Sequence, residues 1–188
     1  MYIAIISGCI FLICCMLVGS KKTDSIDQRF SICIIDHRNH LITPIMHAFT
    51  ELGKGTPTMV ICLSLLFLPE RGNLALPVGI SVIATIFLSK WLKTVIHRER
   101  PKDGRLVEES DFSFPSAHAL TSAALYGSIA LHMGIILPQY HILIIIVCIL
   151  IPLLIGFSRI YLGIHYLFDV LGGWSLGLFI ASLTTLFL

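Results

Sequence analysis

Residues 141–188 read HILIIIVCILIPLLIGFSRIYLGIHYLFDVLGGWSLGLFIASLTTLFL. Two apolar runs in this stretch, 141–163 and 166–188, each reach the roughly 20 residues that a helix needs to cross a bilayer. Arg159, His165 and Asp169 interrupt them where the first run ends and the second begins. Ionisable side chains at membrane depth are costly and usually line a site or cavity. The stretch therefore predicts two spanning helices joined at a polar site; the alternative is a purely structural buried ion pair.

Four more apolar runs of membrane length, or nearly so, precede this stretch. They lie at 2–19, roughly 56–69, 74–92 and 116–137. The composition agrees, because 56% of the residues are hydrophobic and 13% are charged, where a soluble domain carries roughly 25% charged residues. We predict an all-α integral membrane bundle of about six transmembrane helices. The length suits a single domain over residues 1–188, with the catalytic motifs within 93–169.

The segments between these runs complete the predicted topology. Residues 2–19 lack the basic start and the cleavage signal of a secretory peptide, so we expect an uncleaved first span. Residues 24–52 mix charged and apolar positions, which favours an interfacial helix between the first two spans. Residues 69–73 and 138–140 are typical of short turns. The six cysteines lack metal-ligand spacing, and a net charge of +2 with no long basic stretch does not suggest nucleic acid.

A first polar cluster closes the run at 74–92. Lys93 and Arg100 are seven residues apart, two helical turns, so they are expected to share a helix face that Pro101 ends. Arg presents a planar fork that matches phosphate oxygens, and Lys adds a point charge. The alternative is a basic segment that binds lipid headgroups or sets the topology.

A second cluster opens the run at 116–137 with the sequence SFPSAH, residues 113–118. Ser113 is a candidate helix cap, and Pro115 suits a first helical turn. Amides around Ser116 would then face outward as an anion site. His118 could act as a general acid, because imidazole suits proton transfer near neutral pH. An ordinary capped helix with an interfacial histidine is the alternative.

The third cluster contains a histidine–carboxylate pair. His165 and Asp169 are spaced i, i+4, so they are expected to be neighbours on one helical face. A carboxylate that binds one imidazole nitrogen fixes the tautomer and leaves the other nitrogen as a nucleophile. With six crossings all three clusters lie at one membrane face, so a single site can form.

Taken together, the three clusters resemble the three signature motifs of the type 2 phosphatidic acid phosphatase superfamily. The segments LVEESDFSFPSAH and SRIYLGIHYLFDVLGGWSLG look most like small bacterial membrane lipid phosphatases, of the phosphatidylglycerophosphate phosphatase B type. The resemblance implies that Lys93, Arg100 and Arg159 bind a phosphate, with hydrogen bonds from Ser116, Ala117 and nearby amides. It also implies that His165 attacks phosphorus, His118 transfers protons and Asp169 orients His165, without a metal or other cofactor.

Two features depart from the family pattern or conflict with what it implies. The family commonly has glycine where Ala117 stands, and a methyl group there leaves the site intact but with less room. The family's bacterial membrane enzymes usually face outward, so we expect an extracytoplasmic site in a bacterial inner membrane. Lys21, Lys22 and the basic residues of 93–105 instead favour a cytoplasmic face by the positive-inside rule.

The expected activity is hydrolysis of a lipid phosphate monoester or diphosphate through a phosphohistidine. Candidate substrates are phosphatidylglycerophosphate, phosphatidic acid and undecaprenyl diphosphate, with an undecaprenyl-diphosphate phosphatase as a specific alternative. An anion or lipid transporter could use the same cations without chemistry, although it has no need of a nucleophile, and transporters tend to show internal repeats. A structural subunit and a vanadate-dependent haloperoxidase are weaker alternatives.

Overall fold

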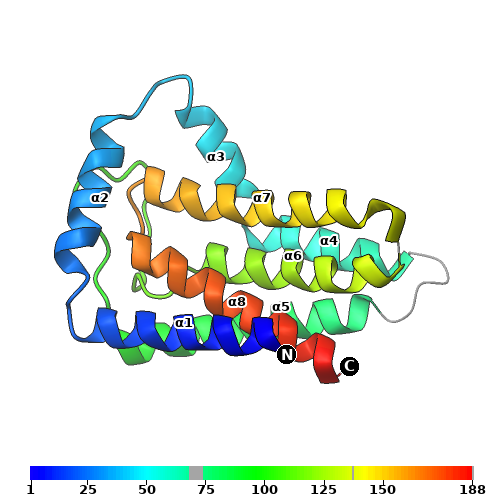
Figure 1. Cartoon of the computed structure of the whole chain (residues 1–188). Coiled ribbons are helices and arrows are strands. Elements are labelled where there is room, and N and C mark those ends of the chain that lie inside the picture. The colour runs from blue at the N-terminus through cyan, green and yellow to red at the C-terminus, as the bar shows by residue number, and fades with distance from the viewer. Residues whose placement is uncertain (68–73, 137, 188) are drawn as a thin grey trace.

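The computed structural model describes residues 1–67, 74–136 and 138–187 of the chain. Every regular element within these residues is a helix (Figure 1). The α-helices are α1 (Tyr2–Gly19), α2 (Asp24–Asp36), α3 (Thr43–Leu52), α4 (Gly55–Ser64), α5 (Ala75–Ile96), α6 (Ala117–Ile136), α7 (His141–Tyr161) and α8 (Leu167–Phe187). Two short 3-10 helices are η1 (Leu65–Phe67) and η2 (Pro138–Tyr140). The turn predicted at 69–73 lies outside the described residues.

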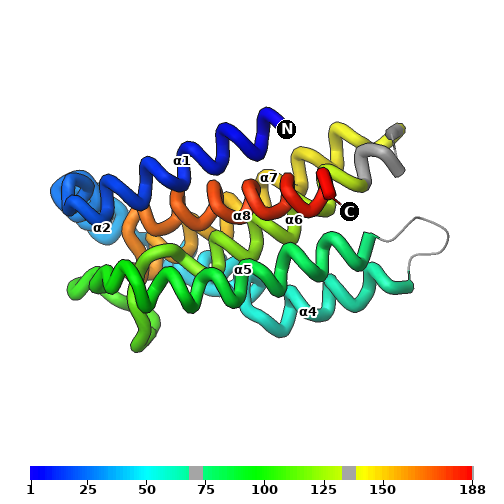
Figure 2. The backbone as a smooth tube through the Cα atoms, turned by 90° about the horizontal axis from the view of Figure 1, so that it is seen from below, coloured from blue at the N-terminus to red at the C-terminus, as the bar shows by residue number. Residues whose placement is uncertain are grey.

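The long helices form the predicted membrane bundle (Figure 1, Figure 2). Of the described helices, α1, α5, α7 and α8 are long and apolar enough to cross a membrane, and α4 with η1 forms a shorter apolar helix. The 20 residues of α6 run between α5, α7 and α8. α4 and α6 lie beside these four helices, so the all-helical bundle agrees with the prediction of about six membrane helices. Large apolar side chains such as Leu12 on α1 and Leu143 on α7 are 60% exposed, which suits contact with hydrocarbon.

The segment predicted as one interfacial helix is two helices. α2 lies across one end of the bundle and α3 leads back from it (Figure 1). Between them, the Asn39 side chain accepts a hydrogen bond from the Leu41 amide at 2.8 Å, a side-chain turn that replaces helical bonding. Arg38 donates to the carbonyls of Tyr161 and Gly104, so the turn is fixed to the end of α7. The prediction of a single helix was therefore wrong, because a side-chain turn stops it.

Two glycines of α8 allow it to approach α6 closely. A Cβ atom at Gly173 would lie 2.8 Å from the carbonyl oxygen of Ser116, and one at Gly177 would overlap the carbonyl oxygen of Leu120. Real side chains do not reach such distances, so the two helix backbones can meet only because these positions carry no side chain. This contact sets the first turns of α6 and α8 side by side.

All three polar clusters lie at the α2 end of the bundle, as the predicted six crossings require. α5 ends at Ile96, where His97 takes a left-handed conformation with φ 50°. α7 ends at Tyr161, and Gly163 turns the chain at φ 75° toward α8. At the start of α8, Asp169 accepts a hydrogen bond from the Tyr166 amide at 2.8 Å, as the third residue of a capping box does. The ends of α5 and α7 and the start of α8 therefore bring their polar residues together.

Candidate active site

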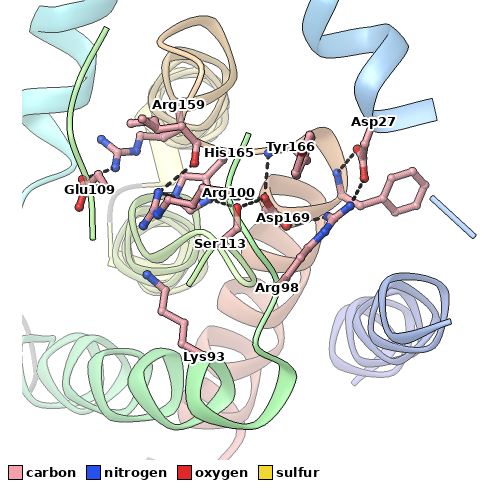
Figure 3. A network of polar contacts seen from close by, with 12 residues as sticks. Asp27, Lys93, Arg98, Arg100, Glu109, Ser113, Arg159, His165, Tyr166 and Asp169 are labelled. Atoms are coloured by element: carbon pink, nitrogen blue, oxygen red, sulfur yellow. Dashed lines mark hydrogen bonds and ion pairs between the residues drawn. The ribbon is translucent and has the colours of Figure 1, made fainter. Parts of the chain in front are cut away.

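Three basic side chains meet at this end of the bundle (Figure 3). Lys93 belongs to the last turn of α5, Arg159 to the last turn of α7, and Arg100 to the segment between α5 and α6. They are 7%, 2% and 5% exposed, respectively. Buried charges need partners, so this cluster, the cation cradle, is built to hold negative charge. The structure brings together all three predicted phosphate-binding cations.

Lys93 and Arg100 do not share a helix face as predicted. α5 ends four residues before Arg100, and the chain reverses at His97 before Pro101 is reached. Arg100 instead donates through Nε to the carbonyl of Asp111 at 2.8 Å and through Nη1 to the carbonyl of Ile164 at 2.9 Å. Backbone acceptors from two loops therefore place its guanidinium, which a helix register could not do.

Two acidic residues of the segment between α5 and α6 occupy the cation cradle. Asp111 binds Lys93 at 2.5 Å and also accepts from Nη2 of Arg100. Glu109 accepts from Nη2 of Arg159 at 2.7 Å, while Thr50 of α3 accepts from its Nη1 at the same distance. These partners could not be predicted from the sequence, because acidic residues in a loop carry no signal of what they contact.

The Asp111 carboxyl is strongly stabilised in its ionised form. Partial burial alone would raise its pKa, but hydrogen bonds and charges from Lys93 and Arg100 lower that pKa to about 2. The carboxylate therefore stays charged at every physiological pH and balances the cradle. Its side chain is still 52% exposed, so it lies at the mouth of the cluster rather than beneath it.

His165 faces the cation cradle through one ring nitrogen. Its Nε2 lies 3.1 Å from Nη1 of Arg100. A guanidinium can only donate, so Nε2 is the acceptor and the ring proton belongs on Nδ1. Burial first, and then the positive charges of Arg100 and Arg159, hold the pKa of His165 well below its usual value. A neutral ring with its lone pair toward the cations is suited to attack an electrophile bound there.

Asp169 stands behind His165, but the two are not on one helical turn. His165 precedes α8, whereas Asp169 lies in its first turn. Nδ1 of His165 is 3.5 Å from Oδ2 of Asp169, long for a hydrogen bond. Ser113 completes the contact: its Oγ donates to Oδ2 of Asp169 at 2.5 Å and lies 3.3 Å from Nδ1 of His165. The predicted pair is present, joined by a serine hydroxyl.

Ser113 is therefore not a helix cap, and that prediction was wrong. α6 begins at Ala117, so Pro115 precedes the helix instead of opening it. The amide of Ser116 is also taken, since it donates to the carbonyl of Asp169 at 3.0 Å. Residues 114–116 therefore contact the start of α8. Ser113 was not predicted as a site residue, because a serine shortly before a helix is typical of a helix cap.

His118 and its neighbours supply polar atoms that have no partner within the described residues. These buried atoms are Nε2 of His118, Oγ of Ser116 and Nε of Arg159. Buried polar atoms normally have a hydrogen-bonding partner. The positive charges that act on His118 include those of Arg159 and Lys93. Ala117, the first residue of α6, is half-buried beside them. An oxyanion with several acceptor oxygens would fit these vacant donors.

A cavity of about 710 Å³ opens between α2, the end of α1 and residues 96–103. Arg98 and Arg100 are among its lining residues, but neither His118 nor His165 is. Arg98 was missed by the sequence analysis. Its guanidinium binds Asp169 at 2.7 Å and Asp27 of α2 at 2.6 Å, so Asp169 has a buried cation behind it.

The sequence of this chain matches the model of a known protein family. The PAP2 superfamily model matches residues 74–188, more than half of the chain. The chain belongs to the PAP2 superfamily. The matched region runs from the start of α5 to the end of the chain and includes all three polar clusters, as the sequence resemblance implied.

Two curated relatives match most of the chain. Phosphatidylglycerophosphatase B of Bacillus subtilis is 34% identical over 174 residues, 89% of this chain and 86% of the relative. Undecaprenyl-diphosphatase of Sulfolobus acidocaldarius is 25% identical over 174 residues, 89% of this chain and 81% of the relative.

Solved PAP2 structures agree with the fold. The crystal structure of a transmembrane PAP2-type phosphatidylglycerolphosphate phosphatase from Bacillus subtilis superposes with a TM-score of 0.91 at 33% identity. The match covers 100% of this chain and 96% of that one. Aquifex aeolicus LpxE, at 23% identity and a TM-score of 0.71, covers 85% and 94% of the two chains and shares the fold. The membrane bundle is thus a transmembrane PAP2 fold.

Proposed function

We propose that this PAP2 protein is a membrane lipid phosphatase that hydrolyses a lipid phosphate monoester or diphosphate through a phosphohistidine. The observation that carries the proposal is the cation cradle of Lys93, Arg100 and Arg159 with Nε2 of His165 directed at Arg100. Fixed positive charge around a neutral nucleophile is the arrangement that phosphoryl transfer requires. The whole chain, residues 1–188, acts as one catalytic domain.

Binding places the phosphate oxygens among the cations. Lys93, Arg100 and Arg159 neutralise the charge, while Ser116 and amides near Ala117 donate hydrogen bonds. The carboxylates of Asp111 and Glu109 leave the cations as the phosphate arrives, because both anions need the same donors. Arg100 turns from Nε2 of His165 to a phosphate oxygen, which frees the lone pair.

The first chemical step transfers the phosphoryl group to His165. The Nε2 lone pair attacks phosphorus, the N–P bond forms, and the P–O bond to the leaving group breaks. His118 protonates the leaving oxygen. Asp169 and Ser113 hold the Nδ1 proton and stabilise the positive charge that develops on the ring.

The second step returns the enzyme. His118 takes a proton from a water molecule, whose oxygen attacks phosphorus and breaks the N–P bond to release phosphate. Proton transfer in both directions by one group suits an imidazole. We propose that no metal takes part, since cations and amides of the chain supply the electrostatic stabilisation.

A lipid substrate fits the place of the site in the bundle. Lys93 and Arg159 lie in the last turns of α5 and α7, so a headgroup would sit at the end of these helices while its acyl or prenyl chains lie among them. The two curated relatives are named for phosphatidylglycerophosphate and undecaprenyl diphosphate. We propose phosphatidylglycerophosphate, phosphatidic acid and undecaprenyl diphosphate as candidate substrates of this chain.

The protein is a multi-pass membrane protein of the kind found in bacterial inner membranes. We propose that the site opens on the extracytoplasmic face. The positive-inside rule opposes this orientation. Lys93 and Arg100, however, are ion-paired within the site, so these two cations report on the site rather than on the topology.

Phosphate release by the purified protein in detergent tests the proposal. The panel is phosphatidylglycerophosphate, phosphatidic acid, undecaprenyl diphosphate and a soluble ester, each with EDTA and with His165→Ala as the control. We expect release that persists in EDTA and vanishes in the variant. No release from a folded protein would favour an anion or lipid transporter, and strong loss in EDTA would require a metal-dependent mechanism.

A further inference from the structure

Arg98 is a buried cation that the mechanism above does not use. Its side chain is 9% exposed, and its guanidinium lies 4.6 Å from the centre of the Tyr166 ring. Nη1 donates to Oδ1 of Asp169 at 2.7 Å, and Nη2 donates to Oδ2 of Asp27 at 2.6 Å. Both carboxylates are fully buried. One guanidinium therefore joins a carboxylate of α8 to a carboxylate of α2 (Figure 3).

The two oxygens of Asp169 have different partners. Oδ1 faces Arg98, whereas Oδ2 accepts from the Ser113 hydroxyl and the Tyr166 amide and faces Nδ1 of His165. A guanidinium bound to Oδ1 fixes the rotation of the carboxylate. The direction in which Oδ2 meets His165 therefore depends on Arg98.

Asp27 fixes the other end of this connection. Its Oδ2 binds Arg98, and its Oδ1 accepts from the amide of Phe168 at 3.1 Å, in the first turn of α8. One side chain of the helix across the bundle end thus binds both the guanidinium and the backbone next to Asp169. A buried carboxylate destabilises the fold unless it is fully paired, and both oxygens of Asp27 accept a hydrogen bond.

We propose that Arg98 and Asp27 are positioning residues that hold Asp169 oriented toward His165. The inference rests on the proposed function. Without Arg98, Oδ1 of Asp169 would lose its hydrogen bond and the carboxylate could rotate. Oδ2 would then no longer be held toward Nδ1 of His165, where it stabilises the positive charge that develops on the ring during attack. The effect would therefore fall on the chemical step and not on phosphate binding.

Asp24 offers a matched control. It lies one turn before Asp27 on the same helix, and its Oδ1 is 3.4 Å from the same Nη2 of Arg98. Its side chain is 46% exposed, so this ion pair contributes little. Asp27→Asn and Asp24→Asn make the same chemical change three residues apart, one in a buried connection and one at the surface.

The kinetic test uses the full chain in detergent with phosphatidylglycerophosphate. Asp27→Asn should lower kcat by about tenfold, the usual effect of weakening one hydrogen bond between charged groups. Its KM, and the kcat of Asp24→Asn, should stay within about twofold of wild type. The kcat of Arg98→Lys should lie between those of wild type and Arg98→Met, because the lysine ammonium cannot bind both carboxylates as the planar guanidinium does.

A spectroscopic measurement tests the positioning role without depending on turnover. Nitrogen NMR of protein labelled at histidine reports the ring tautomer, and the His165 signal is the one absent in His165→Ala. All of these proteins should keep the proton on Nδ1, because Arg100 still donates to Nε2. The Nδ1 resonance should match wild type in Asp24→Asn but shift in Asp27→Asn and Arg98→Met, because Nδ1 faces the Ser113 hydroxyl and the Asp169 carboxylate. Phosphate release that survives His165→Ala would refute the proposed function alone. Unchanged His165 signals in both variants, or equal effects of the two aspartate changes, would refute the positioning role.

Discussion

Nζ of Lys93 lies 2.5 Å from Oδ2 of Asp111. The same carboxylate accepts from Arg100, and Glu109 binds Arg159. Every cation of the cradle is thus paired with a carboxylate at the place where the proposed mechanism puts phosphate oxygens. Substrate binding is an exchange of anions, so its affinity depends on how firmly these carboxylates are held.

Asp111→Asn should tighten the binding of phosphate-like inhibitors. The amide cannot compete as an anion, so the dissociation constant of vanadate should fall by about tenfold, equivalent to about 1.4 kcal/mol. Inhibition of phosphate release measures it. Asp103→Asn changes an exposed residue of the same segment and should have no effect. Weaker vanadate binding in Asp111→Asn would show that the carboxylate organises the cradle instead of competing for it.

The advantage of Asp111→Asn should not change between about pH 5 and about pH 8. An Asp carboxyl titrates near 3.9 in an unfolded chain, and Lys93 and Arg100 lower the Asp111 pKa to about 2. The ionised Asp111 carboxylate therefore stabilises the folded protein fully above about pH 4, and this stabilisation is lost only as the pH falls toward 2. The ratio of vanadate dissociation constants for wild type and variant, measured across the range, checks this. A ratio that collapses toward pH 5 would mean that the carboxyl already binds a proton there.

His118→Ala should discriminate between leaving groups. A lipid alkoxide needs a proton as it departs, whereas p-nitrophenolate does not. The variant should therefore lose about 100- to 10,000-fold in kcat on a lipid ester, the usual contribution of general acid catalysis, and clearly less on p-nitrophenyl phosphate. Phosphate release from both substrates by one preparation gives the comparison. Equal losses on the two would remove His118 from the acid role.

Ser113→Ala should lower kcat without raising KM. The hydroxyl lies 2.5 Å from Oδ2 of Asp169 and 3.3 Å from Nδ1 of His165, so its loss leaves only the 3.5 Å contact between them. We expect a decrease of about tenfold, the equivalent of one hydrogen bond to a charged group. Ser110→Ala, at an exposed position of the same segment, is the control. Full activity in Ser113→Ala would show that the direct contact suffices.

Gly177→Ala should destabilise the bundle. An added methyl would overlap the carbonyl oxygen of Leu120, and separating two packed helices costs about 1–3 kcal/mol. Thermal unfolding in detergent measures the loss as a lower Tm. Gly79→Ala on α5 meets nothing within 4 Å and should be neutral or stabilising by up to about 1 kcal/mol, since alanine is the better helix former. Similar behaviour of the two variants would contradict the close packing of α6 on α8.

The bundle could be predicted from the sequence because membrane-length apolar runs carry their own signal. The runs at 2–19 and 141–163 match α1 and α7 to within two residues. The end of α5 could not be predicted, because no strong breaker precedes Pro101 and the reversal at His97 depends on contacts of the following segment. The break between α2 and α3 depends likewise on Asn39 and Arg38 binding locally and to α7.

The site was predicted wherever a residue interrupts an apolar run, as Arg159, His165 and Asp169 do. What remained hidden were partners that come from distant segments. Asp27 resembles a surface residue of an interfacial helix, and Asp111 a loop acid. Only the fold shows that one is fully buried and the other bridges two cations.

The chain begins and ends toward the end of the bundle that lies away from α2 and the site (Figure 1). In a membrane, an even number of crossings puts both ends in one compartment and the catalytic residues in the other. A fluorescent protein or protease tag fused to either end therefore reports the compartment opposite the reaction. Fluorescence that is retained only in the cytoplasm would place hydrolysis outside the cell without any lipid substrate being assayed.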